Sequence, residues 1–266
     1  MRNWVTNSIA GAAILCLAAQ APAAAQAPKP AATQSAPKPA VKPAGPAPRL
    51  ADGTPDLSGV WMGGGGVSPR NLKPGDTIEL LPSAKKIMDS RQLNDDPEAR
   101  CLPTGVPRMN PYPWRMVQSI DMKYVFILFE GNIHSYRQIF LDGRKHPTDP
   151  DPTWYGHSIG QWEKDTLVVD TVGYNDLFWF GANGLPHTTK LHTIERFRRT
   201  DLNTLSWDIT IDDPGAFAKP FTVQTRARLE PTWELMEYIC QENNTNVGHI
   251  QGAANSGAAN GGELGR

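Results

Sequence analysis

The stretch LSWDITIDDPGAFAKPFTVQTRARL occupies residues 205–229 and alternates apolar with polar side chains in two runs. Every second residue from 205 to 211 is apolar, and the same period of two returns from 221 to 229. Such alternation is typical of a β-strand that buries one face. The DPG segment at 213–215 favours a turn or loop between the runs. The stretch therefore predicts two successive strands.

Similar runs extend outward from this stretch in both directions. Only residues 83–93 have convincing helical character. Five prolines between residues 95 and 114 exclude regular structure there and predict an ordered loop that Cys101 pins. The further strands that we expect lie at 58–62, 122–129, 133–141, 158–162, 166–171, 191–198 and 235–240.

About nine strands, joined mostly in sequence order, define the predicted fold class. A long meander must close on itself or leave edge strands that invite aggregation. We therefore expect a mostly β protein with a single antiparallel β-barrel-like domain that is closed or nearly closed. A two-sheet β-sandwich is the alternative.

The ends of the chain differ in composition from its centre. Residues 1–25 have the basic, apolar and small-residue order of a secretory signal peptide, which predicts a periplasmic or secreted protein. Residues 26–49 are rich in Pro, Ala and Lys and predict a disordered linker, whose lysines could contact an anionic cell envelope. The barrel-like domain is expected over 50–247, followed by a disordered Gly/Ala/Asn tail over 248–266.

Charge and hydropathy limit the classes of partner that the protein is expected to bind. The chain has 26 basic and 27 acidic residues, and its first 51 residues hold five basic and no acidic ones. The remainder carries 21 basic against 27 acidic residues, a net charge of about −6, without a basic stripe. Nucleic acid is therefore not an expected partner. The apolar run in the signal peptide is too short to span a bilayer, so no transmembrane segment is expected in the mature chain.

Three cysteines are present, and one of them, Cys16, lies inside the predicted signal peptide. The mature chain would keep Cys101 and Cys240. Because an exported protein matures in an oxidising compartment, we expect these two to form a disulfide. Two separate buried thiols are the alternative.

Two resemblances bear on fold and export. Gly59-Val60-Trp61 resembles the G-x-W that opens lipocalins, whose barrels carry small apolar ligands. A broader likeness, covering nearly all of the core, is to an uncharacterised family of secreted bacterial proteins. It implies secretion and a mostly β fold but no catalytic residue, and Lys164 stands where the family's first motif has Gly. This likeness is carried by WEKDTLVVDT at 162–171, LHTIERF at 191–197, TIDDP at 210–214, DLSGVW at 56–61 and CLP at 101–103.

Four of the six histidines fall in one stretch, namely His146, His157, His187 and His192. Imidazole titrates near neutrality and is the commonest metal ligand, so chemistry is expected here. With Asp149, Asp151 or Glu195 these histidines could form a Zn or Fe centre. However, none of the pairs has a tight ligand spacing and no H-E-x-x-H occurs. We therefore predict no cofactor and keep Zn or Fe as the alternative.

The preferred chemistry is acid–base catalysis from the segment DPDPTWYGHS at 149–158. Its prolines stiffen the approach to Tyr155 and His157, and Asp151 or Glu195 would orient the imidazole. The predicted catalytic residues are therefore His157, Tyr155, Asp151 and Glu195. A purely structural alternative holds Glu195 in an ion pair with Arg226 or Arg228. The residues assigned to substrate binding are Trp154, Trp179, His187 and His192.

These features predict an exported small-molecule enzyme of the lyase, isomerase or hydrolase type. Its substrate would be apolar or aromatic and would lie in an aromatic-lined cavity of the barrel. A non-catalytic, lipocalin-like carrier of an apolar ligand is the first alternative. An envelope-associated interaction protein, favoured by the Lys-Pro linker, is the second.

Overall fold

The computed structural model describes residues 45–108, 112–131 and 134–242, together with positions 244, 250, 252 and 254. The predicted signal peptide and most of the predicted linker lie outside these residues. In the described ranges, no helix has the length and apolar character needed to cross a membrane.

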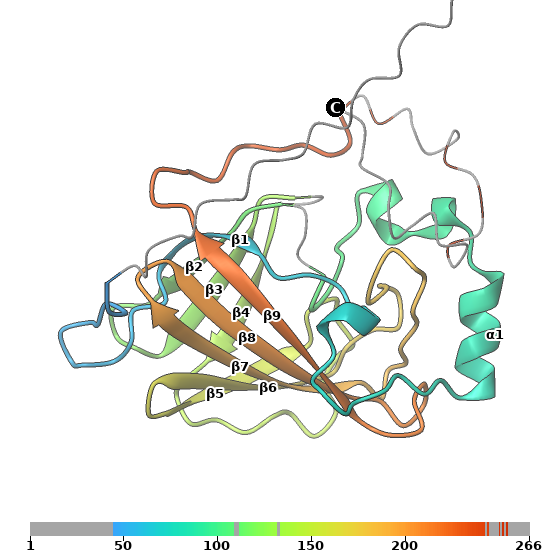
Figure 1. Cartoon of the computed structure of the whole chain (residues 1–266), viewed down its shortest axis with the longest axis horizontal. Helices are drawn as coiled ribbons and strands as arrows, with labels where there is room; N and C mark the ends of the chain where they lie inside the picture. Colours follow the sequence, from blue (N-terminus) through green and yellow to red (C-terminus); the bar gives the residue numbers. More distant parts are fainter. Residues whose placement is uncertain are drawn as a thin grey trace, which may run out of the picture. The chain divides into compact units, whose positions relative to one another are not determined.

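Nine strands form one closed barrel, which confirms the predicted mostly β, barrel-like fold and excludes the sandwich (Figure 1). The strands follow one another in sequence order around the wall, and β9 pairs with β1 to close it. Their bounds are β1 Gly59–Gly63, β2 Trp114–Gln118, β3 Tyr124–Phe129, β4 Ser135–Phe140, β5 His157–Glu163, β6 Thr166–Val172, β7 His192–Asp201, β8 Thr204–Asp212 and β9 Phe221–Leu229.

The predicted strands differ from the observed ones in two places. Strand β2 was not predicted, and it starts directly after Pro113, the last of the prolines that mark the preceding loop. Conversely, residues 235–240 form no strand. Their backbone instead donates to side chains near the β3–β4 turn, from Met236 N to Glu130 Oε2 (2.8 Å) and from Tyr238 N to His134 Nε2 (2.8 Å).

Helical structure is sparse but extends into the proline-rich loop. Helix α1 spans Pro82–Ser90, within two residues of the expected start and three of the expected end. Short 3-10 helices cover Pro69–Asn71, Leu93–Asp95 and Pro97–Arg100. The last two correct the expectation that residues 95–114 contain no regular structure. Pro97 fits the first turn of a helix because no intrahelical partner is required of its nitrogen.

One neighbouring pair in the wall is not antiparallel. Strands β4 and β5 run parallel and share only two register pairs, Ile139 with Ser158 and Phe140 with Ile159. The connection over 141–156 returns along the outside of the barrel before β5 begins, so both strands run in the same direction. We call this short junction the β4–β5 seam. It corrects the expectation of a fully antiparallel barrel.

Side chains fill the barrel interior. Trp61, Trp114 and Trp207 are fully or almost fully buried, with ring centroids 6.4 Å apart for Trp61 and Trp114 and 6.1 Å apart for Trp114 and Trp207. Phe197 stacks on Trp207 at 5.2 Å. Burial of this aromatic surface is the main stabilising contribution of the side chains that alternate into the barrel. The interior is therefore a packed core, and the grooves considered below lie on the outer wall.

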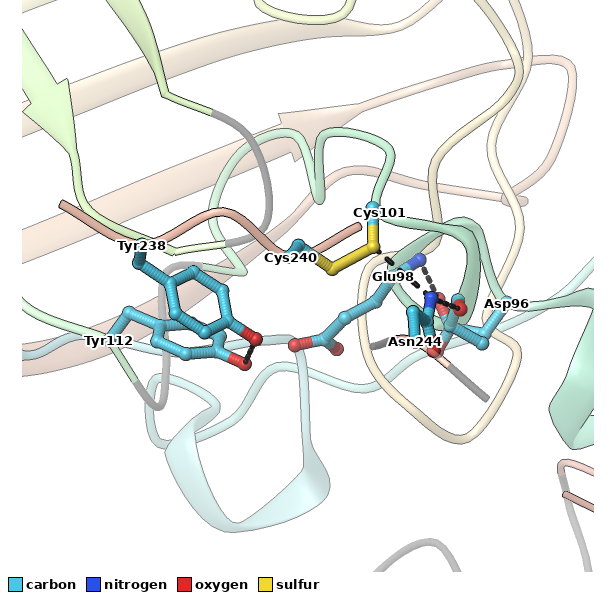
Figure 2. The surroundings of a disulfide bond; sticks show 8 residues. Asp96, Glu98, Cys101, Tyr112, Tyr238, Cys240 and Asn244 are labelled. Carbon is cyan, nitrogen blue, oxygen red and sulfur yellow. Dashed lines mark hydrogen bonds between the residues drawn. A yellow bond between two sulfur atoms is a disulfide. The ribbon is translucent and has the colours of Figure 1, made fainter. Parts of the chain in front are cut away.

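The predicted disulfide between Cys101 and Cys240 is present (Figure 2). It ties the segment after β9 to the loop before β2. Beside it, the rings of Tyr112 and Tyr238 lie 5.3 Å apart with their hydroxyl oxygens at 3.5 Å. Asn244 also donates to Cys101 Sγ at 3.2 Å. The disulfide and the hydrogen bond from Asn244 thus both anchor Cys101, in agreement with the expectation that this residue pins the loop.

Contacts with the barrel domain extend beyond the expected bounds of 50–247. The backbone nitrogen of Leu202 donates to the carbonyl of Gly45 at 2.9 Å, within the predicted linker. In the predicted tail, the nitrogen of Ala254 donates to the carbonyl of Arg91 at 3.1 Å. Short stretches of both flanking segments therefore belong with the domain.

Candidate functional site

Two of the four clustered histidines contact one carboxylate, and a third is hydrogen-bonded to one of these two. His146 and His157 share a hydrogen bond between their Nδ1 atoms at 2.8 Å. Asp170 Oδ1 lies 3.2 Å from His146 Nε2 and 2.8 Å from His192 Nε2. We call these four residues the histidine–aspartate chain. It extends from His157 through His146 and Asp170 to His192.

The alternation of side chains along three strands places His157, Asp170 and His192 of the histidine–aspartate chain on the outer wall of the barrel. His157 is the first residue of β5, Asp170 lies near the end of β6, and His192 is the first residue of β7. Their neighbours Ser158 and Thr193 are fully buried and face the interior. Because successive side chains in a strand point to opposite faces, the two imidazoles and the carboxylate point outward.

An aromatic ring and a guanidinium group complete the surroundings of His157. Its ring stacks on Phe140 at 5.2 Å, and the guanidinium of Arg144 lies 3.8 Å from the centroid of the same Phe140 ring. Burial lowers the pKa of His157 below its ordinary value, and the nearby His146 and Arg144 act in the same direction. His157 is therefore neutral at pH 7.

The hydrogen bonds constrain the protons of the two linked rings. Because the Asp170 carboxylate only accepts, His146 donates to it from Nε2. The bond between the two Nδ1 atoms holds one proton, so one ring donates and the other accepts. When His157 is the donor, its lone pair lies on Nε2. A neutral imidazole in that form is a general base.

Beside His157 lies a groove of about 390 Å³ at the β4–β5 seam, which we call the seam groove. Three of the four predicted catalytic residues line it, namely Asp151, Tyr155 and His157. Asp151 is exposed. The Tyr155 hydroxyl is bonded to Ser135 Oγ at 2.7 Å, and burial raises the Tyr155 pKa to about 12. Tyr155 is thus a protonated phenol at neutral pH.

Glu195, the fourth predicted catalytic residue, does not line the seam groove. It is fully buried inside the barrel and forms a salt bridge with Arg137 of β4. The structure therefore corrects the expected pairing with Arg226 or Arg228, which are both exposed. Trp207 Nε1 also donates to Glu195 Oε1 at 3.1 Å.

Arg137 was missed by the sequence analysis, although it connects the interior with the groove. It is 1% exposed, and it is also among the residues that line the seam groove. Its Nε donates to Ser158 Oγ at 3.0 Å and its Nη2 to Thr171 Oγ1 at 2.8 Å. The available signal was its place two residues before Ile139, in the inward-facing register of an apolar strand.

The predicted substrate-binding residues are scattered. His192 belongs to the histidine–aspartate chain, whereas Trp154, Trp179 and His187 are absent from the lining of the seam groove. Trp179 is buried under the guanidinium of Arg91, 4.8 Å from its ring centroid. His187 packs 3.8 Å from Phe178, and burial lowers its pKa to about 4. His187 is therefore a neutral core residue, and none of the three lines the seam groove.

The Zn or Fe alternative grouped His146, His157, His187 and His192. The structure brings three of these together and leaves His187 apart. Among the residues that the structure describes, no group of three or more His, Cys, Asp or Glu side chains is arranged to hold a metal ion.

The geometry thus defines a closed barrel with a histidine–aspartate chain on its outer wall. Comparison of the chain with protein-family models, curated proteins and solved structures finds no match. The resemblance to a secreted bacterial family accordingly stays a prediction, and the functional argument depends on the site itself.

Proposed function

We propose that the protein is an exported enzyme that transfers a proton on an apolar or aromatic small molecule bound in the seam groove. The observation that carries the proposal is the hydrogen-bonded chain from Asp170 through His146 to His157. It orients the imidazole, and in the proposed mechanism His157 donates from Nδ1 to His146, so that its Nε2 is the proton acceptor. A third group that orients a base is the arrangement that general-base catalysis requires.

In this mechanism His157 Nε2 removes a proton from the substrate or from a water molecule. The resulting imidazolium is stabilised through His146 by the carboxylate of Asp170. Tyr155 supplies a protonated hydroxyl on the same groove, suited to donate a hydrogen bond to a developing oxyanion. Elimination, isomerisation and hydrolysis all begin with such a proton transfer, so the lyase, isomerase and hydrolase types share this machinery.

The groove supports the proposed substrate class. Its volume of about 390 Å³ falls in the roughly 300–1,000 Å³ range of small-molecule sites. Phe140, Tyr136, Pro147 and Pro150 contribute apolar or aromatic surface to its lining. The disulfide supports export, because such bonds persist mainly in oxidising compartments. The lysines proposed to contact the envelope lie outside the described residues.

A non-catalytic carrier is the second candidate. It is favoured by a larger groove of about 620 Å³ on the outer wall. The two candidates differ in one respect, since only the enzyme needs His157 as a base.

Replacing His157 with glutamine is expected to lower kcat/KM about 10²- to 10⁴-fold, the usual contribution of a positioned general base. The test screens aryl esters, β-elimination substrates and enolisable ketones, and then compares the variant on whichever substrate turns over. His134→Gln is the matched control, because His134 is exposed and lies off the seam groove. Equal activity of His157→Gln and the wild type would remove the catalytic assignment.

The pH dependence has a defined sign. His157 acts as a base only when it is neutral, and its pKa lies below the ordinary 6.5. We expect kcat/KM to be level at neutral pH and to fall as the pH drops through that lowered pKa. Long-range ¹H–¹⁵N spectra at pH 7.5 should show the proton of His157 on Nδ1 and that of His146 on Nε2. A proton on His157 Nε2 contradicts the mechanism.

Metal content separates this chemistry from the Zn or Fe alternative. Protein purified without chelators or an affinity tag is expected to contain far less than one transition metal per chain. Elemental analysis provides the measurement. A stoichiometric Zn or Fe signal that disappears in His157→Ala or His192→Ala would replace the metal-free mechanism with a metal-dependent one.

A further inference from the structure

We propose that a second groove on the barrel's outer wall binds a neutral, mainly apolar small molecule that carries a hydrogen-bond acceptor. This groove has a volume of about 620 Å³. It lies over β5, β6 and β7 and is bordered by Asp52, Met122 and the turn after β4. We call it the outer-wall groove. It is a binding site in its own right and does not depend on turnover by His157.

The floor of the groove is apolar although it faces outward. Ile159, Val168 and Ile194 point outward into it. The inward neighbours are polar at Ser158 and Thr193 and apolar at Leu167 and Val169, and all four are fully buried. An antiparallel sheet normally presents polar residues to solvent and apolar ones to the core. Outward apolar residues at this position therefore indicate a surface that is covered by a ligand.

The register makes this floor continuous. Asp170 of β6 pairs with Ile159 on one side and with Ile194 on the other. The Asp170 carboxylate, which His146 and His192 both contact, thus lies between two apolar side chains. A ligand on this floor would touch hydrocarbon on both sides of one fixed polar group. Such a mixture of apolar lining with a few placed polar groups is typical of small-molecule sites.

Trp162 supplies the reason to expect an acceptor on the ligand. Its indole Nε1 is buried and has no hydrogen-bond partner in the part of the chain that the structure describes. Trp162 pairs with the fully buried Leu167 and so belongs to the inward face of β5, and from there it also lines the outer-wall groove. Buried N–H groups in folded proteins are nearly always paired, so an unpaired one calls for a missing partner. A carbonyl oxygen of a ligand would provide it.

The charges around the groove disfavour an anionic ligand. Asp52 and Asp170 line it and would repel an anion. Arg144 also lines it, but its charge is engaged by Asp142, with Nε to Oδ1 at 2.9 Å, so it is not free to attract an anion. The apolar floor in turn favours an uncharged ligand. Apolar contact and the Trp162 indole remain as the means of recognition.

The test uses 6-propionyl-2-(dimethylamino)naphthalene, a neutral aromatic ketone whose emission shifts to the blue in apolar surroundings. The wild type is expected to bind the probe with such a shift. Ile194→Asp, which places a second carboxylate beside Asp170, should weaken binding at least tenfold. The control is Val117→Asp, at an exposed position on β2 away from this groove, and it should bind as the wild type does. Thermal unfolding followed by circular dichroism checks that both variants fold.

The acceptor is tested with a matched probe, 6-propyl-2-(dimethylamino)naphthalene, in which a CH₂ group replaces the carbonyl and whose binding is measured by displacement of the ketone. The wild type should bind it about fivefold more weakly, the change expected for one hydrogen bond. Trp162→Phe should weaken binding of the ketone by a similar factor and abolish the difference between the probes. If the wild type shows no blue shift, or Ile194→Asp binds as the wild type does, the site is refuted. Equal affinity of the wild type for both probes refutes the acceptor-bearing ligand class.

Discussion

Replacing Arg137 with methionine is expected to lower the free energy of unfolding by about 3 to 5 kcal/mol, because it leaves a buried carboxylate without its charge partner. Glu195 is 0% exposed and forms its salt bridge with Arg137 inside the barrel. After the substitution, Trp207 would be the remaining donor to Glu195 in this group. The hydroxyls of Ser158 and Thr171 would also lose the guanidinium that now donates to them.

Urea unfolding with the disulfide intact measures this effect. Arg196→Met on β7 is the matched control, since Arg196 is half exposed and pairs with the exposed Glu163. Surface pairs of this kind contribute about 0 to 1 kcal/mol. The double variant Arg137→Met/Glu195→Gln removes both charges and should be more stable than Arg137→Met alone. A loss below about 1 kcal/mol in Arg137→Met would show that the pair does not stabilise the barrel.

This buried pair illustrates which parts of the fold the sequence predicts. Period-two alternation locates strands because it records which face is buried, and the strands at 205–212 and 221–229 are confirmed almost to the residue. Alternation does not report pairing direction, so the parallel β4–β5 seam was not foreseen. Nor does it identify the partner of Glu195, since Arg137 lies 58 residues earlier and only closure of the barrel brings them together.

For the candidate site too, the local sequence indicates some residues and leaves others to contacts that are distant in sequence. The segment at 149–158 directed attention to Asp151, Tyr155 and His157, and all three line the seam groove. Sequence proximity also grouped His187 with the other histidines, although it packs against Phe178 in the core. The tertiary structure decides between these outcomes, because pairing of β6 with β7 places Asp170 beside His192 and the connection after β4 brings His146 to the same carboxylate. That arrangement depends on contacts distant in sequence, which a local pattern does not encode.

The described residues after β9 form no strand pairing, so the disulfide is the covalent link that restrains them. The Cys101–Cys240 bond closes a loop with a sequence separation of 139. In the chain-entropy account, such a crosslink limits the unfolded ensemble and stabilises the folded state by about 5 kcal/mol. Hydrogen bonds from Met236 and Tyr238 to Glu130 and His134 would remain after its removal, but each contributes only about 1 kcal/mol.

The double variant Cys101→Ala/Cys240→Ala is therefore expected to lose about 3 to 5 kcal/mol of unfolding free energy, the upper part of the range measured for native disulfides. Urea unfolding of the variant beside the wild type with and without reductant provides the measurement. Reductant should destabilise the wild type toward the level of the variant and leave the variant itself unchanged. Thiol counting on denatured, unreduced mature protein should find no free thiol, whereas two free thiols would disprove the bond. A variant as stable as the oxidised wild type would contradict this expectation. It would mean that noncovalent contacts hold the segment after β9 in the folded state. It would also mean that the unfolded chain is already compact in that region, so that the crosslink restrains it little further.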